Sequence, residues 1–142
     1  MIDTKDLEEK IKLNGYKITP QRKAILKVLL NHKGHFLSAE KIHQNTCKTH
    51  PKLNITTIYR NLEILVNINL VHKIQGDEGC LYSIISNKTH HHHIICKGCG
   101  KTEIIDFCPI QKFIDLIKDK NFTLTEHKIE LYGYCQKCKK NH

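Results

Sequence analysis

The chain has 142 residues, of which 39% are hydrophobic and 26% charged, enough for one ordinary domain or two small ones without disulfide staples. This composition excludes a disordered protein, and no apolar run approaches the roughly 18 residues of a membrane span, so no membrane partner is expected. The polar N-terminus lacks the apolar core of a secretory signal, so we expect a cytoplasmic protein. A net charge of +9, seven cysteines and eleven histidines indicate an anionic partner and bound metal rather than disulfides.

Charge divides the sequence into two parts. Residues 1–75 hold 13 Lys and Arg against 6 Asp and Glu, whereas residues 76–142 hold 10 against 8. Most of the cysteines and six of the eleven histidines lie in the second part. The pattern predicts a basic module followed by a metal-rich module, joined by the polar stretch 86–89.

The basic module is predicted to contain short helices followed by a hairpin. The helix-start signals are, in chain order, Asp3 or Thr4, Thr19 with Pro20, Ser38, and Asn54 or Thr56. Apolar strands follow over 71–75 and 80–85, separated by a turn with a glycine at each end. Three or four helices and then a hairpin are the arrangement of a winged helix-turn-helix, whose last helix enters the major groove.

The start of the fourth helix carries the side chains that best fit DNA. Hydroxyl groups can bond phosphates or base edges, a tyrosine ring can pack on a thymine methyl, and an arginine can reach guanine. The candidate DNA contacts are Thr56, Thr57, Tyr59 and Arg60, with Lys17, Arg22 and Lys23 as phosphate contacts. The alternative is an ordinary solvated helix face capped by threonines.

Two Cys-x-x-Cys pairs mark the metal-rich module. Cys96 and Cys99 are separated by 35 residues from Cys135 and Cys138. Two such pairs complete a tetrahedral four-sulfur shell around one ion, which leaves no open position for a substrate. We therefore predict a structural Zn²⁺ held by these four cysteines.

The segment between the two pairs is predicted to be a strand at 101–107, a helix opened by Pro109, and a second strand at 125–134. Apolar residues recur along the helix at core spacing: Ile110, Phe113, Ile114 and Ile117. A fragment of about 50 residues buries little surface alone. Zinc and a second copy of the chain are therefore expected to stabilise it.

A run of histidines, His90 to His93, precedes the first cysteine pair. Alternate side chains of a strand share a face, so this run offers one pair of imidazoles to each face. The pair on one face gives a site that ties the modules together, formed by His91 and His93 with Asp106 or Glu103 and with His35. The pair on the other face gives a possible third site, formed by His90, His92 and His127. Such shells suit zinc, iron, manganese or nickel, and the alternative is a solvated histidine run with adventitious metal affinity.

These residues resemble the ferric uptake regulator family of bacterial metal-dependent repressors. The similarity covers nearly the whole chain, in segments that follow the family's order: 15–22, 37–40, 56–62, the histidine run leading into 96–101, and 131–138. The resemblance implies an α+β fold. It comprises a winged-helix DNA-binding domain at 1–85, a hinge at 86–89, and a small α/β dimerisation domain with the four-cysteine zinc site at 90–142.

The resemblance also implies a homodimer that binds an inverted-repeat DNA operator when a regulatory Zn²⁺ or Fe²⁺ binds at the hinge. The matching ligands are His91 and His93, with Asp106 as the acidic ligand. Ser83 stands near the position where the family has an acid or cysteine on the wing's second strand, which places a peroxide sensor last among the branches. The family's helix-side histidine is offset, with Phe36 near that position and His35 beside it.

Two further positions bear on the choice of metal. Cys108 followed by Pro109 resembles some zinc-responsive members, which favours zinc over iron. At the third site the family's remaining acidic ligand falls near Gln111. Cys47, Cys80 and Cys108 are given no role beyond that of small buried cysteines.

We therefore expect a metal-dependent transcriptional repressor and not an enzyme. One rival is a zinc enzyme with an open histidine and carboxylate site, using Glu103 or Cys108 as acid, base or nucleophile. Another is a zinc-ribbon adaptor or a zinc-storage protein that uses the histidine run. The segment 56–62 favours the repressor, because neither rival requires it.

Overall fold

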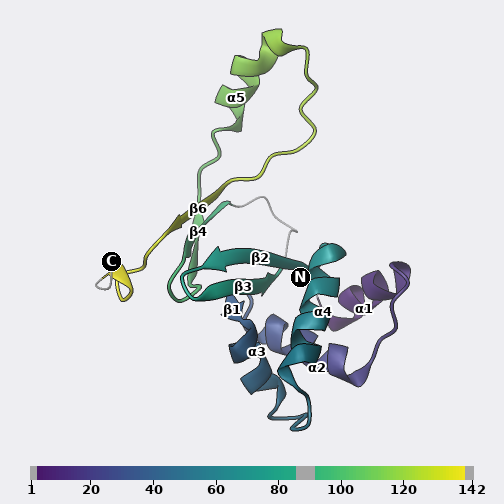
Figure 1. Ribbon diagram of the computed structural model, residues 1–142. Helices are drawn as coiled ribbons and strands as arrows, with labels where there is room; N and C mark the ends of the chain where they lie inside the picture. The colour runs from purple at the N-terminus through teal and green to yellow at the C-terminus, as the bar shows by residue number, and fades with distance from the viewer. Residues whose placement is uncertain (1–2, 86–91, 140–142) are drawn as a thin grey trace.

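The computed structural model describes residues 3–85 and 92–139 (Figure 1). The expected hinge at 86–89 and two of the candidate ligands, His90 and His91, lie outside the described residues. The elements are α1 (Thr4–Leu13), α2 (Pro20–Asn31), β1 (Leu37–Ser38), α3 (Ala39–Thr46), α4 (Ile55–Asn67), β2 (Val71–Gly76), β3 (Gly79–Ile84), β4 (His92–Cys96), β5 (Thr102–Ile105), α5 (Ile110–Ile117), the short 3-10 helix η1 (Lys118–Lys120) and β6 (Glu130–Gly133).

The first four helices begin at polar side chains that satisfy a backbone N–H of the first turn. Each capping oxygen accepts a hydrogen bond from the N–H three residues further on, and the caps are Asp3, Thr19, Ser38 and Asn54. Such a cap stabilises a helix by about 1 kcal/mol, because the first N–H groups have no partner inside the helix. All four helices of the basic module are therefore confirmed, and Thr4 and Thr56 lie inside their helices instead of capping them.

The wing is an antiparallel hairpin of β2 and β3, with β1 added to the outer edge of β3. The two-residue strand β1 was not predicted, because two residues carry no alternation pattern. One large apolar core fills the space between the helices and this sheet. Three residues of α4 that were expected in the core, Ile58, Leu62 and Leu65, are fully buried there.

The second sheet has the strand order β5-β4-β6, with β4 antiparallel to β5 and parallel to β6. Of the strand predicted over 125–134, only Glu130–Gly133 is a strand. The expectation was wrong for 125–129, because within the described residues β4 pairs only with 130–133 of this segment.

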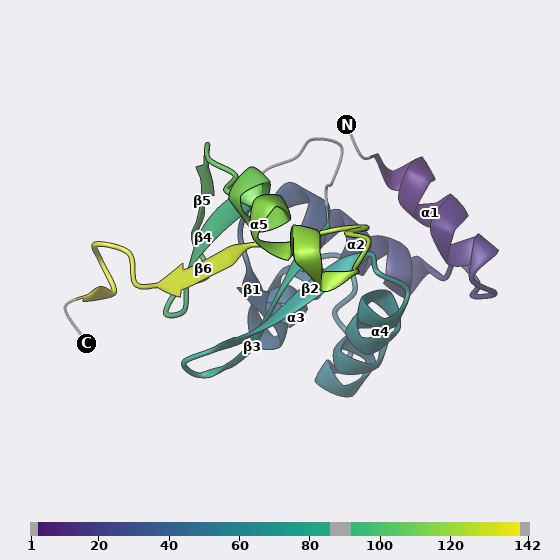
Figure 2. The ribbon, with the colours of Figure 1, turned by 90° about the horizontal axis from the view of Figure 1, so that it is seen from above.

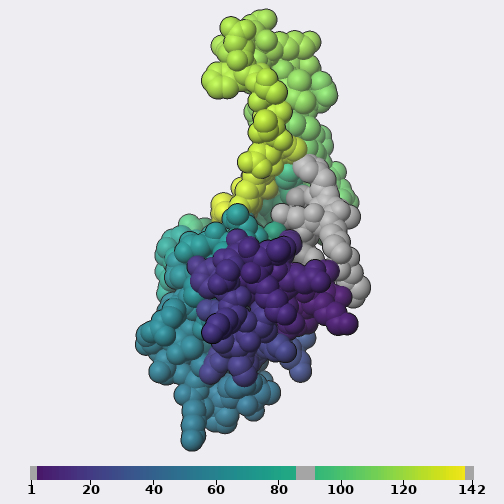
Figure 3. Space-filling view, turned by 90° about the vertical axis from the view of Figure 1, so that its right-hand side faces the viewer, coloured from purple at the N-terminus to yellow at the C-terminus, as the bar shows by residue number. Residues whose placement is uncertain are grey.

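Helix α5 stands away from both sheets at the end of two extended legs, 106–109 and 121–129, so that it forms the tip of an arm (Figures 1 and 3). None of its residues is buried, although four of them have the spacing of a core stripe. Apolar side chains stay exposed along the arm, including Phe113 at 51%, Leu116 at 70% and Phe122 at 80%. No helix in the described part of the chain is both long and apolar enough to cross a membrane.

The two sheets lie side by side (Figure 2) and share a small apolar cluster. Phe36, Ile74 and Ile95 are buried in this cluster, and Leu81 packs against it. The Phe36 N–H donates to the carbonyl of Gly100 over 2.8 Å. A Cβ at Gly100 would lie 2.1 Å from the Phe36 carbonyl oxygen, and its φ of +82° also favours glycine, so only glycine fits this close approach.

Candidate metal centres and nucleic-acid interface

The four cysteines of the two Cys-x-x-Cys pairs meet at one end of the second sheet. Their sulfur atoms all lie within 4.8 Å of one another, and the Sγ atoms of Cys99 and Cys135 are 3.8 Å apart. A tetrahedral zinc with Zn–S bonds of about 2.3 Å has sulfurs about 3.8 Å apart. Gly98 allows the two pairs to approach, because a Cβ there would lie 2.9 Å from Sγ of Cys138. The donor set and its spacing fit a structural zinc.

Backbone hydrogen bonds prepare this cluster to hold a cation. Burial opposes ionisation of Cys96, but N–H donors of Cys135, Cys99 and Gly98 outweigh it and lower the pKa of Cys96 to about 6. A hydrogen bond to Cys135 raises the pKa of Cys138 to about 12. The metal-free cluster therefore keeps part of its protons at neutral pH, and a divalent ion that binds all four sulfurs must displace them.

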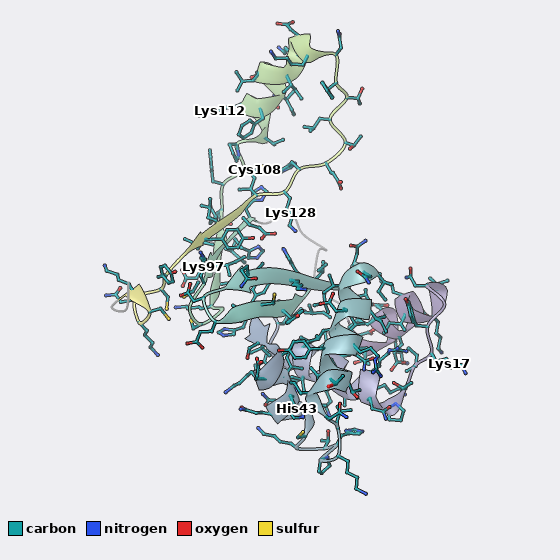
Figure 4. The ribbon with its side chains drawn as sticks, viewed as in Figure 1. Lys17, His43, Lys97, Cys108, Lys112 and Lys128 are labelled. Atoms are coloured by element: carbon teal, nitrogen blue, oxygen red, sulfur yellow. The ribbon has the colours of Figure 1, made fainter. Side chains whose placement is uncertain are left out.

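A second group of ligand atoms lies at the base of the arm. His92 comes from β4, Cys108 from the leg that leads to α5, and His127 from the returning leg, and their ligand atoms lie within 4.8 Å of one another. The Sγ of Cys108 is 3.3 Å from Nε2 of His127, and the two imidazole ring centroids are 5.3 Å apart. Figure 4 shows Cys108 where the arm leaves the sheet. The structure thus brings together the described members of the predicted third site and adds a thiol to them.

The predicted linking site is not assembled among the described residues, which contain only the two ligand groups above. Strand register separates one of the candidate acids from His93. His93 is paired with Ile104, and β5 ends at Ile105, just before Asp106. Glu103 is paired with Ile94 on the opposite face, where it forms an ion pair with Lys101.

The candidate ligand His35 lies at the junction of the two sheets. Its Nε2 is 3.1 Å from the carbonyl oxygen of Cys99, and its backbone forms a bridge with Lys101. A second histidine of the winged unit, His72 on β2, contacts strand β6 of the second sheet, and the sequence did not single it out. His72 contacts the ring of Phe36 edge-on, and its Nε2 lies 3.0 Å from Oε1 of Glu130 on β6.

The surroundings of His72 and Glu130 shift both pKa values downward. Burial lowers the pKa of His72, with Glu130 opposing the shift and Lys128 and His93 adding to it. Burial raises the pKa of Glu130, but hydrogen bonds from Tyr132 and Lys128 outweigh it and leave the pKa below its usual value. At neutral pH the carboxylate is therefore ionised and the imidazole neutral.

The exposed start of α4 carries most of the predicted DNA contacts. Thr56, Tyr59 and Arg60 are exposed there, while Thr57 is half-buried and donates its hydroxyl to the side chain of Asn54. Tyr59 donates its hydroxyl to Glu40 over 2.9 Å, and this bond raises the pKa of Tyr59. The phenol is thus neutral and held in a fixed position on the helix surface.

Arg22 makes contacts inside the winged unit. Its Nε donates to Oδ1 of the buried Asn61 on α4 over 2.9 Å, and its Nη1 donates to the carbonyl of Lys17 over 2.6 Å. The guanidinium also lies 5.5 Å from the centroid of the Tyr16 ring. Arg22 therefore fixes α4 relative to α2, whereas Lys17 is exposed and labelled at the edge of the unit in Figure 4.

A winged helix-turn-helix joined to an α/β unit with a four-thiolate site defines a class of metal-binding, winged-helix proteins. A family model described as the ferric uptake regulator family matches residues 13–132. The chain is 34% identical over 140 residues to the ferric uptake regulation protein of Staphylococcus epidermidis, covering 99% of each chain. It therefore belongs to the ferric uptake regulator family.

Two more relatives place it within that family. The chain is 35% identical over 142 residues to the peroxide-responsive repressor PerR of Staphylococcus aureus, covering 94% of this chain and 91% of that protein. Its structure is similar to that of the Helicobacter pylori ferric uptake regulator, with a TM-score of 0.73 and 29% identity, covering 95% of this chain and 90% of that one. That protein is described as having three functional metal-binding sites. The relative named for ferric uptake and the relative named for the peroxide response are 34% and 35% identical to this chain. Sequence identity therefore does not distinguish between these two branches of the family.

Proposed function

We propose that this protein is a cytoplasmic, metal-activated transcriptional repressor that binds an inverted-repeat operator as a homodimer and controls zinc or iron homeostasis genes. The observation that carries the proposal is the exposed face of α4, with Thr56, Tyr59 and Arg60 at its start. Neither a zinc enzyme nor a zinc-storage protein needs such a face. Two such helices in a dimer reach half-sites about one helical turn, roughly 34 Å, apart.

The proposed switch is the angle between the winged unit and the second sheet. A metal bound by ligands from both units favours one angle, because the ion binds more tightly where all its ligands converge. The proposed regulatory ligands are His91, His93 and Asp106. The metal is Zn²⁺ or Fe²⁺, with zinc favoured by the thiol chemistry of the neighbouring site.

The exposed apolar side chains of the arm favour the proposed dimer. α5 and its legs expose several large apolar side chains, whose exposure to water does not stabilise a monomer. A second copy of the chain that covers this surface would bury it. The same contact would set the spacing of the two α4 helices on DNA.

The base of the arm is proposed as a further metal site, formed by His92, Cys108 and His127 and, by resemblance, His90. The thiol at Cys108 sets this site apart from one built of imidazoles and carboxylates, since thiolates favour zinc over manganese. Co²⁺ in place of the metal reports a thiolate ligand by its charge-transfer absorption. We expect Cys108→Ala to remove that absorption for one ion per chain, and Cys80→Ala to leave it unchanged.

The DNA-binding proposal is tested with a duplex selected from random sequence by the zinc-loaded protein. Arg60→Ala is expected to weaken binding to this duplex by about 1–3 kcal/mol, because one arginine contact to a base is worth that much. Zinc per chain should stay the same. Lys112→Ala, which removes an exposed charge on α5, is the matched control. Wild-type affinity in Arg60→Ala contradicts the assignment of α4.

A further inference from the structure

The ammonium group of Lys128 links the wing to the second sheet, away from the four-cysteine cluster and the base of the arm. His72 from β2 and Glu130 from β6 place Nε2 and Oε1 only 3.0 Å apart. The Nζ of Lys128 lies 2.9 Å from that oxygen and 3.1 Å from that nitrogen. Figure 4 shows Lys128 between β6 and the wing. Side chains from β2, β6 and the returning leg of the arm therefore meet at the ammonium group of Lys128.

The two atoms that face the ammonium are both electron-pair donors. An ammonium has no lone pair, so in the 3.1 Å hydrogen bond Nε2 of His72 must be the acceptor. Oε1 of Glu130 is buried, and its near neighbours among the described residues are the Lys128 ammonium at 2.9 Å and Nε2 of His72 at 3.0 Å. A neutral imidazole and a carboxylate with converging lone pairs form a donor pair for a divalent cation.

The spacing of these donors fits one metal ion. Two ligand atoms that are each about 2.0–2.2 Å from a metal ion lie about 2.8–3.1 Å apart at an octahedral angle of 90° and about 3.3–3.6 Å apart at the tetrahedral angle, so a separation of 3.0 Å falls within the range for one ion. The side chain of Glu130 is 13% exposed and that of His72 is 24% exposed, so both donors are largely removed from water. Lys128 is 68% exposed and can move its flexible side chain into solvent at little cost.

A third donor lies on the neighbouring strand. Glu130 is the registered partner of His93 across the parallel pair of β4 and β6, and registered partners share a face about 4.8 Å apart. His72 is itself the cross-strand partner of Ser83. The imidazole of His72 thus stands beside the wing position where the sequence lacks an acid or cysteine.

We propose that His72 and Glu130 join His93 in binding the sensing metal, in addition to the proposed ligands His91 and Asp106, and that the Lys128 ammonium occupies the metal position when no metal is bound. The metal then links β2 of the winged unit to β4 and β6 of the second sheet. Lys128 competes with the metal for the same two atoms and so sets the metal concentration at which the site fills. The regulatory role of this metal rests on the proposed function, whereas its binding by these side chains does not.

The test measures Mn²⁺ binding by the electron paramagnetic resonance signal of the free ion. The protein is the full chain loaded with structural zinc, in a Cys108→Ala, His127→Ala background that removes the site at the base of the arm. Lys128→Met is expected to tighten Mn²⁺ binding at least tenfold, because the competing charge is gone. Lys128→Arg, which keeps the charge, should bind as the background does. Lys112→Met controls for a change in net charge.

The ligand variants must act in the opposite direction. His72→Ala and Glu130→Gln are each expected to weaken Mn²⁺ binding at least tenfold, with zinc per chain and circular dichroism unchanged, whereas His50→Ala should have no effect. Equal or weaker binding in Lys128→Met, or unchanged binding in His72→Ala, overturns the proposal. Operator binding is scored separately on wild-type protein, so its failure would reject the proposed function without touching the metal result.

Discussion

The winged unit and the α/β unit of this chain are stabilised in different ways. In the winged unit, side chains of four helices and three strands fill one core, and many of them are fully buried. In the α/β unit, the described residues form a small sheet with an exposed helix, and its shared apolar cluster includes only Ile95 from that unit. Burial therefore explains the first unit, whereas the second buries few side chains of its own among the described residues, and we expect a metal ion and a second copy of the chain to stabilise it.

The largest effect should come from breaking the four-cysteine site. We expect Cys96→Ser to abolish zinc retention and unfold 92–139, because zinc supplies about 10–16 kcal/mol to small structural sites. Backbone NMR signals of 3–85 should survive. Cys80→Ser is the control and should keep one zinc per chain. A Cys96→Ser protein that retains zinc and the signals of 92–139 contradicts the assignment.

The next effect concerns the core of the winged unit. Leu62 on α4 is fully buried, so Leu62→Ala should lower the free energy of unfolding of this unit by about 2–5 kcal/mol. Denaturant titration measures the loss, and zinc per chain should stay constant. Leu13→Ala, at a position 86% exposed, should cost less than about 0.5 kcal/mol. Equal losses in the two variants would show that this unit is not held by its core.

The arm offers a smaller effect on assembly. Leu116 is 70% exposed on α5, and burying a leucine in an interface contributes about 1.5–3 kcal/mol. Leu116→Asp should therefore weaken the dimer at least about tenfold in sedimentation velocity. Lys112→Asp places the same charge on an exposed polar position and should dimerise as the wild type does. A Leu116→Asp dimer of unchanged affinity would place the interface elsewhere.

The smallest effect is on alkaline stability. Burial, and then the hydrogen bond to Glu130, raise the pKa of Tyr132 from 10.0 to about 12. A raised pKa means that the folded state holds the proton more tightly, so this contribution is present below pH 10 and is lost as the pH rises towards 12. Tyr132→Phe should flatten the loss of stability in that window and remove one late-ionising tyrosine from the absorbance titration. An unchanged titration curve would contradict the hydrogen bond.

Much of the fold follows from local signals in the sequence. Capping side chains and apolar stripes gave the first four helices because their energies are local to a few residues. The spacing of the cysteines likewise predicted that Cys96, Cys99, Cys135 and Cys138 lie together, since two Cys-x-x-Cys pairs suit one tetrahedral ion. Core spacing in α5 was correct as a pattern, but no residue of α5 is buried in the described part of the chain.

The rest of the candidate sites depends on contacts between distant segments. Cys108 and His127 meet only because the two legs of the arm return to the same edge of the sheet. His72 meets Glu130 only because the wing packs beside β6. A single sequence gives no sign of either contact, although the unassigned thiol at Cys108 and the lone imidazole at His72 are chemical types that merit attention.

In the proposed switch, metal bound by the second unit controls DNA binding by the first. The direct measurement keeps the structural zinc, removes exchangeable metal with a mild chelator, and titrates Zn²⁺, Fe²⁺ and Mn²⁺ separately. Fluorescence anisotropy of the selected duplex and bound metal per chain are followed together. We predict that operator affinity rises by about 5- to 150-fold as further metal binds beyond the structural zinc, the range of typical allosteric coupling. An affinity that does not change while metal binds would contradict the account.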